Sequence, residues 1–223
     1  MHADYWHEKW SGDRIAFHQD SVNKRLQEFW KQLDLAAGAA VFVPLCGKSL
    51  DMLWLHRQGH PVLGVEFSEK AGEAFFREND LDCTRSVEGD FLRLSGQGPA
   101  QGIELLIGDF FALTPAQVAH CQGVYDRAAM IALDGELRNA YAHHLGALLV
   151  ADTRALLLTI SYDQARMQGP PFSVSDDNAR ELLSNDFRIE ELAYYSGPRH
   201  VGNLADRGLE TLDERVYLLT RKS

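Results

Sequence analysis

The sequence predicts an α/β fold, in which a mostly parallel β-sheet carries helices on both faces. Short runs rich in Val, Leu and Ile alternate with helical patterns along most of the 223 residues. These runs are apolar on both faces, which is typical of parallel strands buried between two layers of helices. The chain is long enough to form one such domain with a substantial core.

The elements can be assigned in order along the chain. Two helical segments come first, a short aromatic one with Trp6 and Trp10 and a longer one over residues 21–33. Five apolar runs are expected to form the parallel strands, at 40–44, 61–66, 103–107, 122–126 and 155–161. Helices are expected between them, at 49–58, 69–79 and 135–149. Ser49 is a favourable N-cap for the first of these helices, and Gly59 ends it.

The C-terminal part has a different pattern. Residues 187–195 and 214–220 read as two strands joined by a polar loop that contains several glycines. This loop has no room for a helical crossover, so the two strands are expected to be antiparallel. Residues 82–102, which are also rich in glycine, are expected to form a small extra hairpin or loop. We therefore expect one domain over residues 1–223, with an N-terminal helical lid at 1–36 and an α/β core at 37–223.

Composition narrows the functional classes. The formal net charge is −10 and no basic cluster offsets it, so neither nucleic acid nor an anionic membrane is expected as a partner. The three cysteines lack paired spacing, which argues for a reducing compartment and against a disulfide framework or a zinc site. No signal peptide is visible, and no apolar stretch approaches the roughly 20 residues needed to span a bilayer. We expect a cytoplasmic protein that binds no metal.

The most informative motif is the turn after the first predicted strand, Val43-Pro44-Leu45-Cys46-Gly47-Lys48-Ser49. Glu66 ends the second strand about 20 residues later, where doubly wound folds place an acid that binds a ribose diol. The turn lacks the repeated glycines that a dinucleotide pyrophosphate needs, and Phe42 stands where a Walker A loop needs its first glycine. A ligand with adenine, ribose and a charged amino-acid tail but no phosphate fits better. S-adenosylmethionine is such a ligand.

Polar residues also follow the other central strands. Asp109 and Phe110 come after the third parallel strand, and Asp126 and Arg127 end the fourth. Ligands of doubly wound sheets lie at the carboxyl ends of the strands, so these acids are expected to line an adenosine site. The alternative interpretation is that they cap helices at strand–helix turns.

At this point a family resemblance becomes visible. The chain resembles the thiopurine S-methyltransferases, in particular the bacterial ones, in the order and spacing of several stretches. These are Trp10 with Ala16-Phe17-His18-Gln19, Val43-Pro44-Leu45-Cys46-Gly47-Lys48, the run from Gly59 to Ser68, Tyr125-Asp126-Arg127-Ala128, Gly169-Pro170-Pro171-Phe172, Arg199-His200 and Val216-Tyr217-Leu218-Leu219-Thr220. The resemblance implies a class I methyltransferase fold, with a seven-stranded, mostly parallel sheet whose last strand is antiparallel.

The resemblance also implies which residues bind S-adenosyl-L-methionine: Trp10, Leu45, Glu66, Asp109, Phe110 and Arg127. In this interpretation Glu66 holds the ribose hydroxyls, Leu45 offers backbone groups, and Asp109 and Phe110 flank the adenine. Arg127 pairs with the methionine carboxylate, because guanidinium and carboxylate match in bidentate fashion. Trp10 packs over the cofactor, where an indole face is attractive to a sulfonium.

For the acceptor, the resemblance implies that Phe17 stacks on an aromatic thiol and that the catalytic Arg199 faces its sulfur. A nearby guanidinium favours the thiolate, the better nucleophile for in-line attack on the methyl group. We expect a monomer that methylates small aromatic or heterocyclic thiols such as thiopurines, with a role in detoxification, and that also accepts selenium or tellurium compounds.

Three other functions stay open at the level of sequence. One is a small-molecule O- or N-methyltransferase on the same fold, which would need a general base near the methyl group. Another is a nucleotide-binding or NAD-dependent α/β enzyme, which the missing glycines disfavour. The third is a binding module that senses the cofactor without turnover. The segment 89–108 and the loop 203–213 depart from the family pattern, which leaves Asp109, Phe110 and the acceptor less firmly placed.

Overall fold

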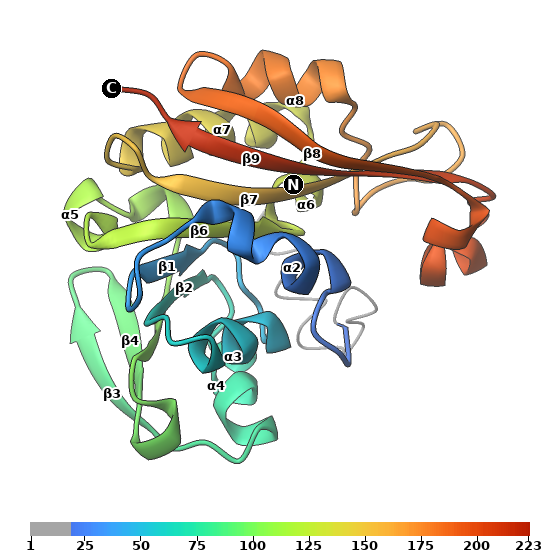
Figure 1. The fold of residues 1–223 in the computed structure, drawn as a ribbon. Helices are drawn as coiled ribbons and strands as arrows, with labels where there is room; N and C mark the ends of the chain where they lie inside the picture. The colour runs from blue at the N-terminus through green and yellow to red at the C-terminus, as the bar shows by residue number, and fades with distance from the viewer. Residues whose placement is uncertain (1–18) are drawn as a thin grey trace.

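A mixed β-sheet of nine strands runs through the computed structural model, which describes residues 19–223 (Figure 1). The five expected parallel strands are all present, as β1 (Ala40–Val43), β2 (Val62–Glu66), β5 (Ile103–Ile107), β6 (Cys121–Arg127) and β7 (Arg154–Ser161). The expected antiparallel hairpin follows as β8 (Phe187–Gly197) and β9 (Leu212–Arg221). The order across the sheet is β3-β4-β5-β2-β1-β6-β7-β9-β8.

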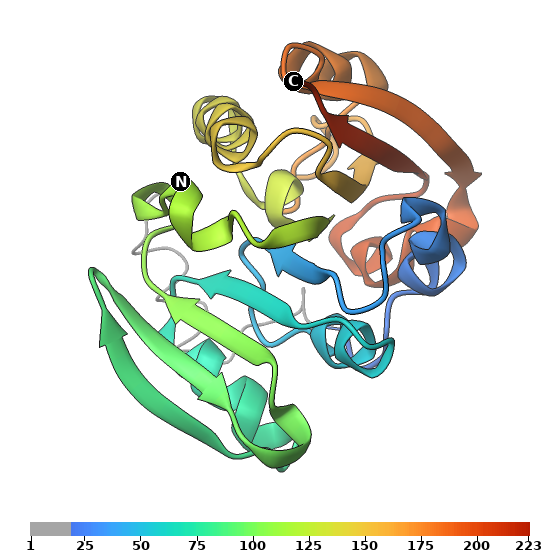
Figure 2. The ribbon, with the colours of Figure 1, turned by 60° about the vertical axis from the view of Figure 1, so that its left-hand side comes forward.

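The predicted number of seven strands is too low for the described residues. Two further strands, β3 (Cys83–Glu88) and β4 (Phe91–Gly96), form an antiparallel hairpin that joins the sheet beside β5. Figure 2 shows this hairpin at the outer edge of the sheet. Most of β3 is exposed to solvent, so its sequence lacks the apolar run by which the other strands can be recognised. The other seven strands keep the expected arrangement, with β9 antiparallel to β7.

Helices cover both faces of the sheet (Figure 1). One face is covered by α2 (Lys24–Phe29), α3 (Leu50–Arg57) and α4 (Glu69–Glu78). The opposite face is covered by α5 (Pro115–Val118), α6 (Ala129–Ala132), α7 (Gly135–Leu148) and α8 (Asp176–Leu183). Strand residues alternate between the two cores: Val41 and Val43 pack with the first set of helices, and Ala40 and Phe42 with the second.

The helical segment before β1 is shorter than the predicted range of 21–33. It consists of α2 followed by a 3₁₀ helix, η1 (Trp30–Leu33). Asn23 caps α2, since its side-chain oxygen accepts hydrogen bonds from the backbone N–H groups of Arg25 and Leu26. Leu26 and Leu33 are fully buried, so this part of the predicted lid packs into the core.

No helix within residues 19–223 has both the length and the apolar character needed to cross a membrane.

Candidate active site

Four of the strands end side by side at one edge of the sheet, and the predicted cofactor residues follow them. β5, β2, β1 and β6 are consecutive and parallel. Asp109 comes just after β5, Glu66 ends β2, Leu45 comes just after β1, and Arg127 ends β6. In doubly wound sheets this edge, where the connections diverge from the central strands, is the place where ligands bind. The structure thus brings these four residues to one rim.

The turn after β1 is held in a specific shape by its backbone. Leu45 has a φ of 46° and Gly47 a φ of 55°, both in the left-handed region. The backbone N–H of Cys46 donates a hydrogen bond of 3.0 Å to the carbonyl of Val65 on β2. Ser49 then caps α3 by accepting a hydrogen bond from the N–H of Asp51. The turn is therefore fastened to the neighbouring strand at one end and to a helix at the other.

Glu66 fixes the same turn from the side of β2. Its carboxylate accepts a hydrogen bond of 2.9 Å from the N–H of Gly47 and one of 2.8 Å from the N–H of Ser68. The residue is only 6% exposed, and this burial raises the pKa of the carboxyl group, while the backbone N–H donors partly offset the rise. Each carboxylate oxygen accepts at least one backbone N–H, and the N–H of Phe67 also contributes. The lone pairs that remain can accept hydrogen bonds from a diol.

Cys46 lies beside Glu66 and is not arranged for nucleophilic chemistry. Its side chain is 6% exposed. Burial raises the pKa of the thiol, and the nearby charge of Glu66 raises it further, so the thiol keeps its proton at neutral pH. Cys46 is therefore a small buried residue of the turn.

Asp109 and Phe110 differ in how they meet solvent. The N–H of Gly108 donates a hydrogen bond of 2.9 Å to the carbonyl of Glu66, which fastens the end of β5 to the end of β2. Asp109 is exposed, and its carboxylate caps the 3₁₀ helix η3 (Phe110–Ala112) by accepting from the N–H of Phe111. Phe110 is 3% exposed and packs in the core against the rings of Tyr141 and His144. The exposed aromatic ring at this position belongs to Phe111, which the sequence did not single out.

Asp126 has a structural role at the end of β6. It is 1% exposed, and its carboxylate accepts a hydrogen bond of 2.6 Å from the hydroxyl of Tyr141 and one from the N–H of Met130. Burial raises the pKa of Asp126 to about 6. Asp126 is therefore bound to Tyr141 and to the first turn of α6, although the N-cap position of that helix is Ala128. The helix-cap interpretation applies to Asp109, which is the N-cap of η3. The adjacent Arg127 is half-buried, and its guanidinium has no hydrogen bond or ion pair within residues 19–223, which leaves it available for an anionic ligand.

Arg199 lies on the same edge of the sheet but several strands away from Glu66. It belongs to η4 (Pro198–His200), directly after β8, and is exposed. β8 runs parallel to β7, so its loop emerges where the central strands also end. In the sheet order, however, β8 lies five strand spacings from β2, which is about 24 Å. The structure does not bring Arg199 into contact with the four rim residues, because it places Arg199 on a loop that extends beyond the sheet.

Two such loops are joined to each other. The loop after β8 (198–211) and the loop after β7 (162–175) meet in a small apolar cluster. Met167 from the β7 loop packs there with Val201 and Leu209 from the β8 loop and with Leu212, the first residue of β9. Arg207 reaches across and donates hydrogen bonds to the carbonyls of Pro170 and Gln168, at 2.6 and 2.5 Å. No sequence pattern predicts this role of Arg207, because a contact with backbone carbonyls leaves no motif.

Two predicted residues, Trp10 and Phe17, lie outside the described part of the chain. Within that part, no group of three or more His, Cys, Asp or Glu side chains is arranged to hold a metal ion.

Comparison with known proteins agrees with this geometry. A family model described as thiopurine S-methyltransferase matches residues 1–222. A thiopurine S-methyltransferase from Azotobacter vinelandii is 48% identical over 222 residues, which cover 100% of both chains. One from Pseudomonas fluorescens is 48% identical over 217 residues, 97% of this chain and 98% of the relative.

Among solved structures, a 1,6-didemethyltoxoflavin-N1-methyltransferase from Burkholderia thailandensis, crystallised with S-adenosylhomocysteine, has the same fold. The TM-score is 0.64 with 16% sequence identity, over 99% of this chain and 87% of that one.

Proposed function

The chain belongs to the thiopurine S-methyltransferase family, and from this we propose that it transfers the methyl group of S-adenosyl-L-methionine to the sulfur of thiopurines and other aromatic or heterocyclic thiols. The structural observation that carries the proposal is the buried carboxylate of Glu66, which is held by the turn after β1 and has lone pairs left for a ribose diol. When bound, the cofactor supplies an electrophilic methyl group on a sulfonium.

The rim residues have the chemistry that this cofactor requires. We propose that Glu66 accepts hydrogen bonds from the ribose hydroxyls and that the backbone of Leu45 contacts the amino-acid tail. Arg127, which has no ion-pair partner in the described structure, pairs with the methionine carboxylate. Asp109 binds the edge of the adenine. Phe110 supports that position from the core, since its ring is buried.

For the acceptor, we propose that Arg199 stabilises the thiolate and that Phe17 and Trp10 contribute from the N-terminal segment. Methyl transfer by in-line attack needs no covalent intermediate, so most of the rate enhancement comes from positioning. Selenium and tellurium nucleophiles fit the same site, because they are soft and need no general base. Within the lid predicted at residues 1–36, α2 and η1 are packed in the core, so these two elements do not act as a cover.

We further propose a cytoplasmic monomer that acts in detoxification. All three cysteines are free in the structure, which supports a reducing compartment. Methylation caps a reactive thiol, which is the kind of chemistry that detoxification uses.

The first test is a calorimetric titration with S-adenosylhomocysteine, with NAD and ATP as controls. We expect binding in the micromolar range for S-adenosylhomocysteine and none for the two nucleotides. A panel of aryl thiols, phenols and amines then identifies the acceptor class. Binding of NAD or ATP without S-adenosylhomocysteine would contradict the proposal, and methylation of phenols or amines in preference to thiols would point to an O- or N-methyltransferase.

A further inference from the structure

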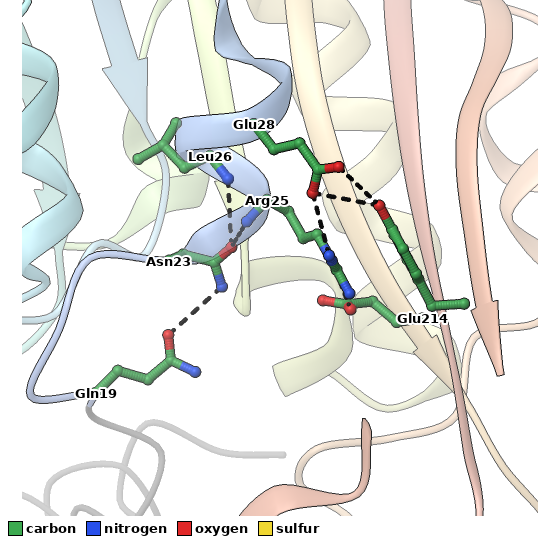
Figure 3. Close-up of polar contacts among 7 residues, drawn as sticks. Gln19, Asn23, Arg25, Leu26, Glu28 and Glu214 are labelled. Atoms are coloured by element: carbon green, nitrogen blue, oxygen red, sulfur yellow. Dashed lines mark hydrogen bonds and ion pairs between the residues drawn. The ribbon is translucent and has the colours of Figure 1, made fainter. Parts of the chain in front are cut away.

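Arg25 connects helix α2 to the hairpin that carries Arg199. Its Nε donates a hydrogen bond of 2.9 Å to Glu214 on β9, and its Nη1 donates one of 3.1 Å to Glu28 on α2. Figure 3 shows Arg25 between these two carboxylates. The guanidinium also lies over the ring of Tyr195 on β8, 3.3 Å from its centroid. The hydroxyl of Tyr195 in turn donates to the carboxylate of Glu28.

These contacts hold both strands of the hairpin at one position. Tyr195 and Glu214 are cross-strand partners in the β8–β9 register, so Arg25 contacts both members of one cross-strand pair. The side chains of Arg25 and Glu214 are only 16% and 20% exposed, which reduces the screening of their charges by water. A planar guanidinium can stack on the ring and pair with the carboxylate at the same time, which a lysine cannot do.

Tyr195 extends this contact to the turn of Arg199. The ring of His200 lies 5.6 Å from the ring of Tyr195, centroid to centroid. Between them the chain leaves β8 at Gly197, whose φ of 113° is available to glycine at little cost, and enters η4. Arg199 therefore lies between the end of β8 and His200 in the sequence. The end of β8 carries Tyr195, and His200 packs against the ring of the same tyrosine, which Arg25 contacts.

Helix α2 itself is anchored without Arg25. The backbone N–H of Asn23 donates a hydrogen bond of 2.8 Å to the buried carboxylate of Asp51, in the first turn of α3. The other oxygen of Asp51 accepts a hydrogen bond from the hydroxyl of Tyr125 on β6. Leu26 adds a fully buried apolar contact. Removal of the Arg25 side chain should therefore leave α2 and the cofactor rim in place.

We propose that Arg25 is a positioning residue for the acceptor: through Tyr195 it sets the place of the η4 turn, and hence of Arg199, relative to the cofactor rim. This inference rests on the proposed function, because it assigns to Arg199 the acceptor thiol. Arg25 touches neither ligand in this proposal.

The test compares three variants with the wild type. Arg25→Ala removes the contact, and Arg25→Lys keeps the charge beside Glu214 but loses the stacking. Arg188→Ala is the matched control. Arg188 is on β8, like Tyr195, but lies at the opposite end of that strand, where it pairs with Asp152 and both side chains are exposed. For each protein we would measure the Kd of S-adenosylhomocysteine, the kcat and KM with 6-mercaptopurine, and the rate of tryptic cleavage after Arg199 and Arg207.

We expect Arg25→Ala to bind S-adenosylhomocysteine within about twofold of the wild type, to lose about tenfold in kcat/KM, and to be cleaved faster at both arginines. Arg25→Lys should be intermediate, and Arg188→Ala should match the wild type. Should Arg25→Ala be insoluble, Tyr195→Leu is the second variant, with the same expected pattern. Wild-type kcat/KM together with wild-type cleavage in Arg25→Ala would overturn the inference, as would an equal loss of cofactor affinity and of kcat/KM.

The tryptic readout separates this inference from the proposed function. A wild type that neither binds S-adenosylhomocysteine nor methylates the thiol refutes the proposed function. Faster cleavage in Arg25→Ala would still support the positioning of the η4 turn, and unchanged cleavage would refute it.

Discussion

Glu66 is a single side chain that holds both the cofactor turn and, in the proposed function, the cofactor itself. Its carboxylate binds the N–H groups of Gly47 and Ser68, and burial of these donors without a partner would be costly. We expect Glu66→Ala to weaken the binding of S-adenosylhomocysteine by about 1–3 kcal/mol, the usual range for a lost charged hydrogen bond. Isothermal titration calorimetry measures this directly.

Glu69→Ala is the matched control for this substitution. Glu69 is on the following helix, and its exposed carboxylate pairs with Arg85. The control should leave the affinity for S-adenosylhomocysteine unchanged. Equal affinities of Glu66→Ala and the wild type would remove Glu66 from the site.

Asp126 gives a pH dependence of stability whose sign can be worked out. Its pKa rises from 3.8 to about 6 in the folded chain because burial penalises the carboxylate. Below about pH 4 both the folded and the unfolded chain hold the proton, so no charge is buried at Asp126 and the fold carries no cost from ionisation. Above about pH 6 both are ionised and the full cost is present. We expect Asp126→Asn to gain stability relative to the wild type across this interval, on the order of 3 kcal/mol.

Denaturant unfolding at several pH values measures this difference, and Asp176→Asn is a control of opposite sign. Burial raises the pKa of Asp176, but hydrogen bonds from Arg180 and Tyr217 outweigh that effect and lower it. Its carboxylate therefore stabilises the fold above the unfolded pKa, and Asp176→Asn should lose relative stability as the pH rises. A pH-independent difference for Asp126→Asn would contradict the role of the buried carboxylate.

At the scale of elements, the two loops beyond the sheet depend on Arg207. Its guanidinium binds two carbonyls of the β7–α8 loop from its position in η5 (Gly202–Arg207). We expect Arg207→Ala to raise the acceptor KM several-fold, because the loops lose their fixed relation, and to leave the Kd of S-adenosylhomocysteine unchanged. Steady-state kinetics with a thiopurine and calorimetry separate the two effects.

Arg166→Ala is the control. This exposed arginine is in the same β7–α8 loop, and its one ion pair within the described residues is a long one, with 4.0 Å between its Nε and Oδ2 of Asp163. The acceptor KM should not change. A larger effect on cofactor affinity than on KM in Arg207→Ala would mean that the loops belong to the cofactor half of the site.

At the scale of the whole molecule, ligand binding should be visible as stability. A ligand that binds only the folded chain stabilises it by about 2.7 kcal/mol at a concentration 100 times its Kd. For a chain of this size we expect S-adenosylhomocysteine to raise Tm by about 5–11 °C. Differential scanning fluorimetry measures the shift. NAD at the same concentration should give none, and a shift with NAD alone would favour a nucleotide-binding protein.

The sheet could be predicted where both faces of a strand are buried, because an apolar run is then visible in sequence. β1, β2 and β5–β7 are of this kind, and β8 and β9 were found from their short polar connection. The hairpin expected within residues 82–102 is present as β3 and β4. That it joins the sheet was not predicted, since Val87, the main apolar residue of the edge strand β3, is 81% exposed. Helix α8 was also missed, because its buried face is only Ala179 and Leu183.

The position of a candidate site residue was predictable where the residue follows a central strand, while its role in binding stays a prediction. Leu45, Glu66, Asp109 and Arg127 meet at one rim because sheet topology decides where strand ends lie. The pattern could not separate Asp126, a buried acid bound to Tyr141, from acids that face a ligand. Nor could the pattern find Arg25, whose partner Glu214 is far away in the sequence. It could not find Arg207 either, because the partners of Arg207 are backbone carbonyls.

The way in which the rim is fastened has a consequence for how acceptor preference can change. Backbone hydrogen bonds tie the end of β1 to β2 and the end of β5 to β2, whereas the two outer loops are joined by one guanidinium and four apolar side chains. In the proposed function, substitutions in those loops change the acceptor side of the site without disturbing the strands. The same architecture can therefore diversify toward new acceptors, in nature or by directed evolution, while it retains one methyl donor.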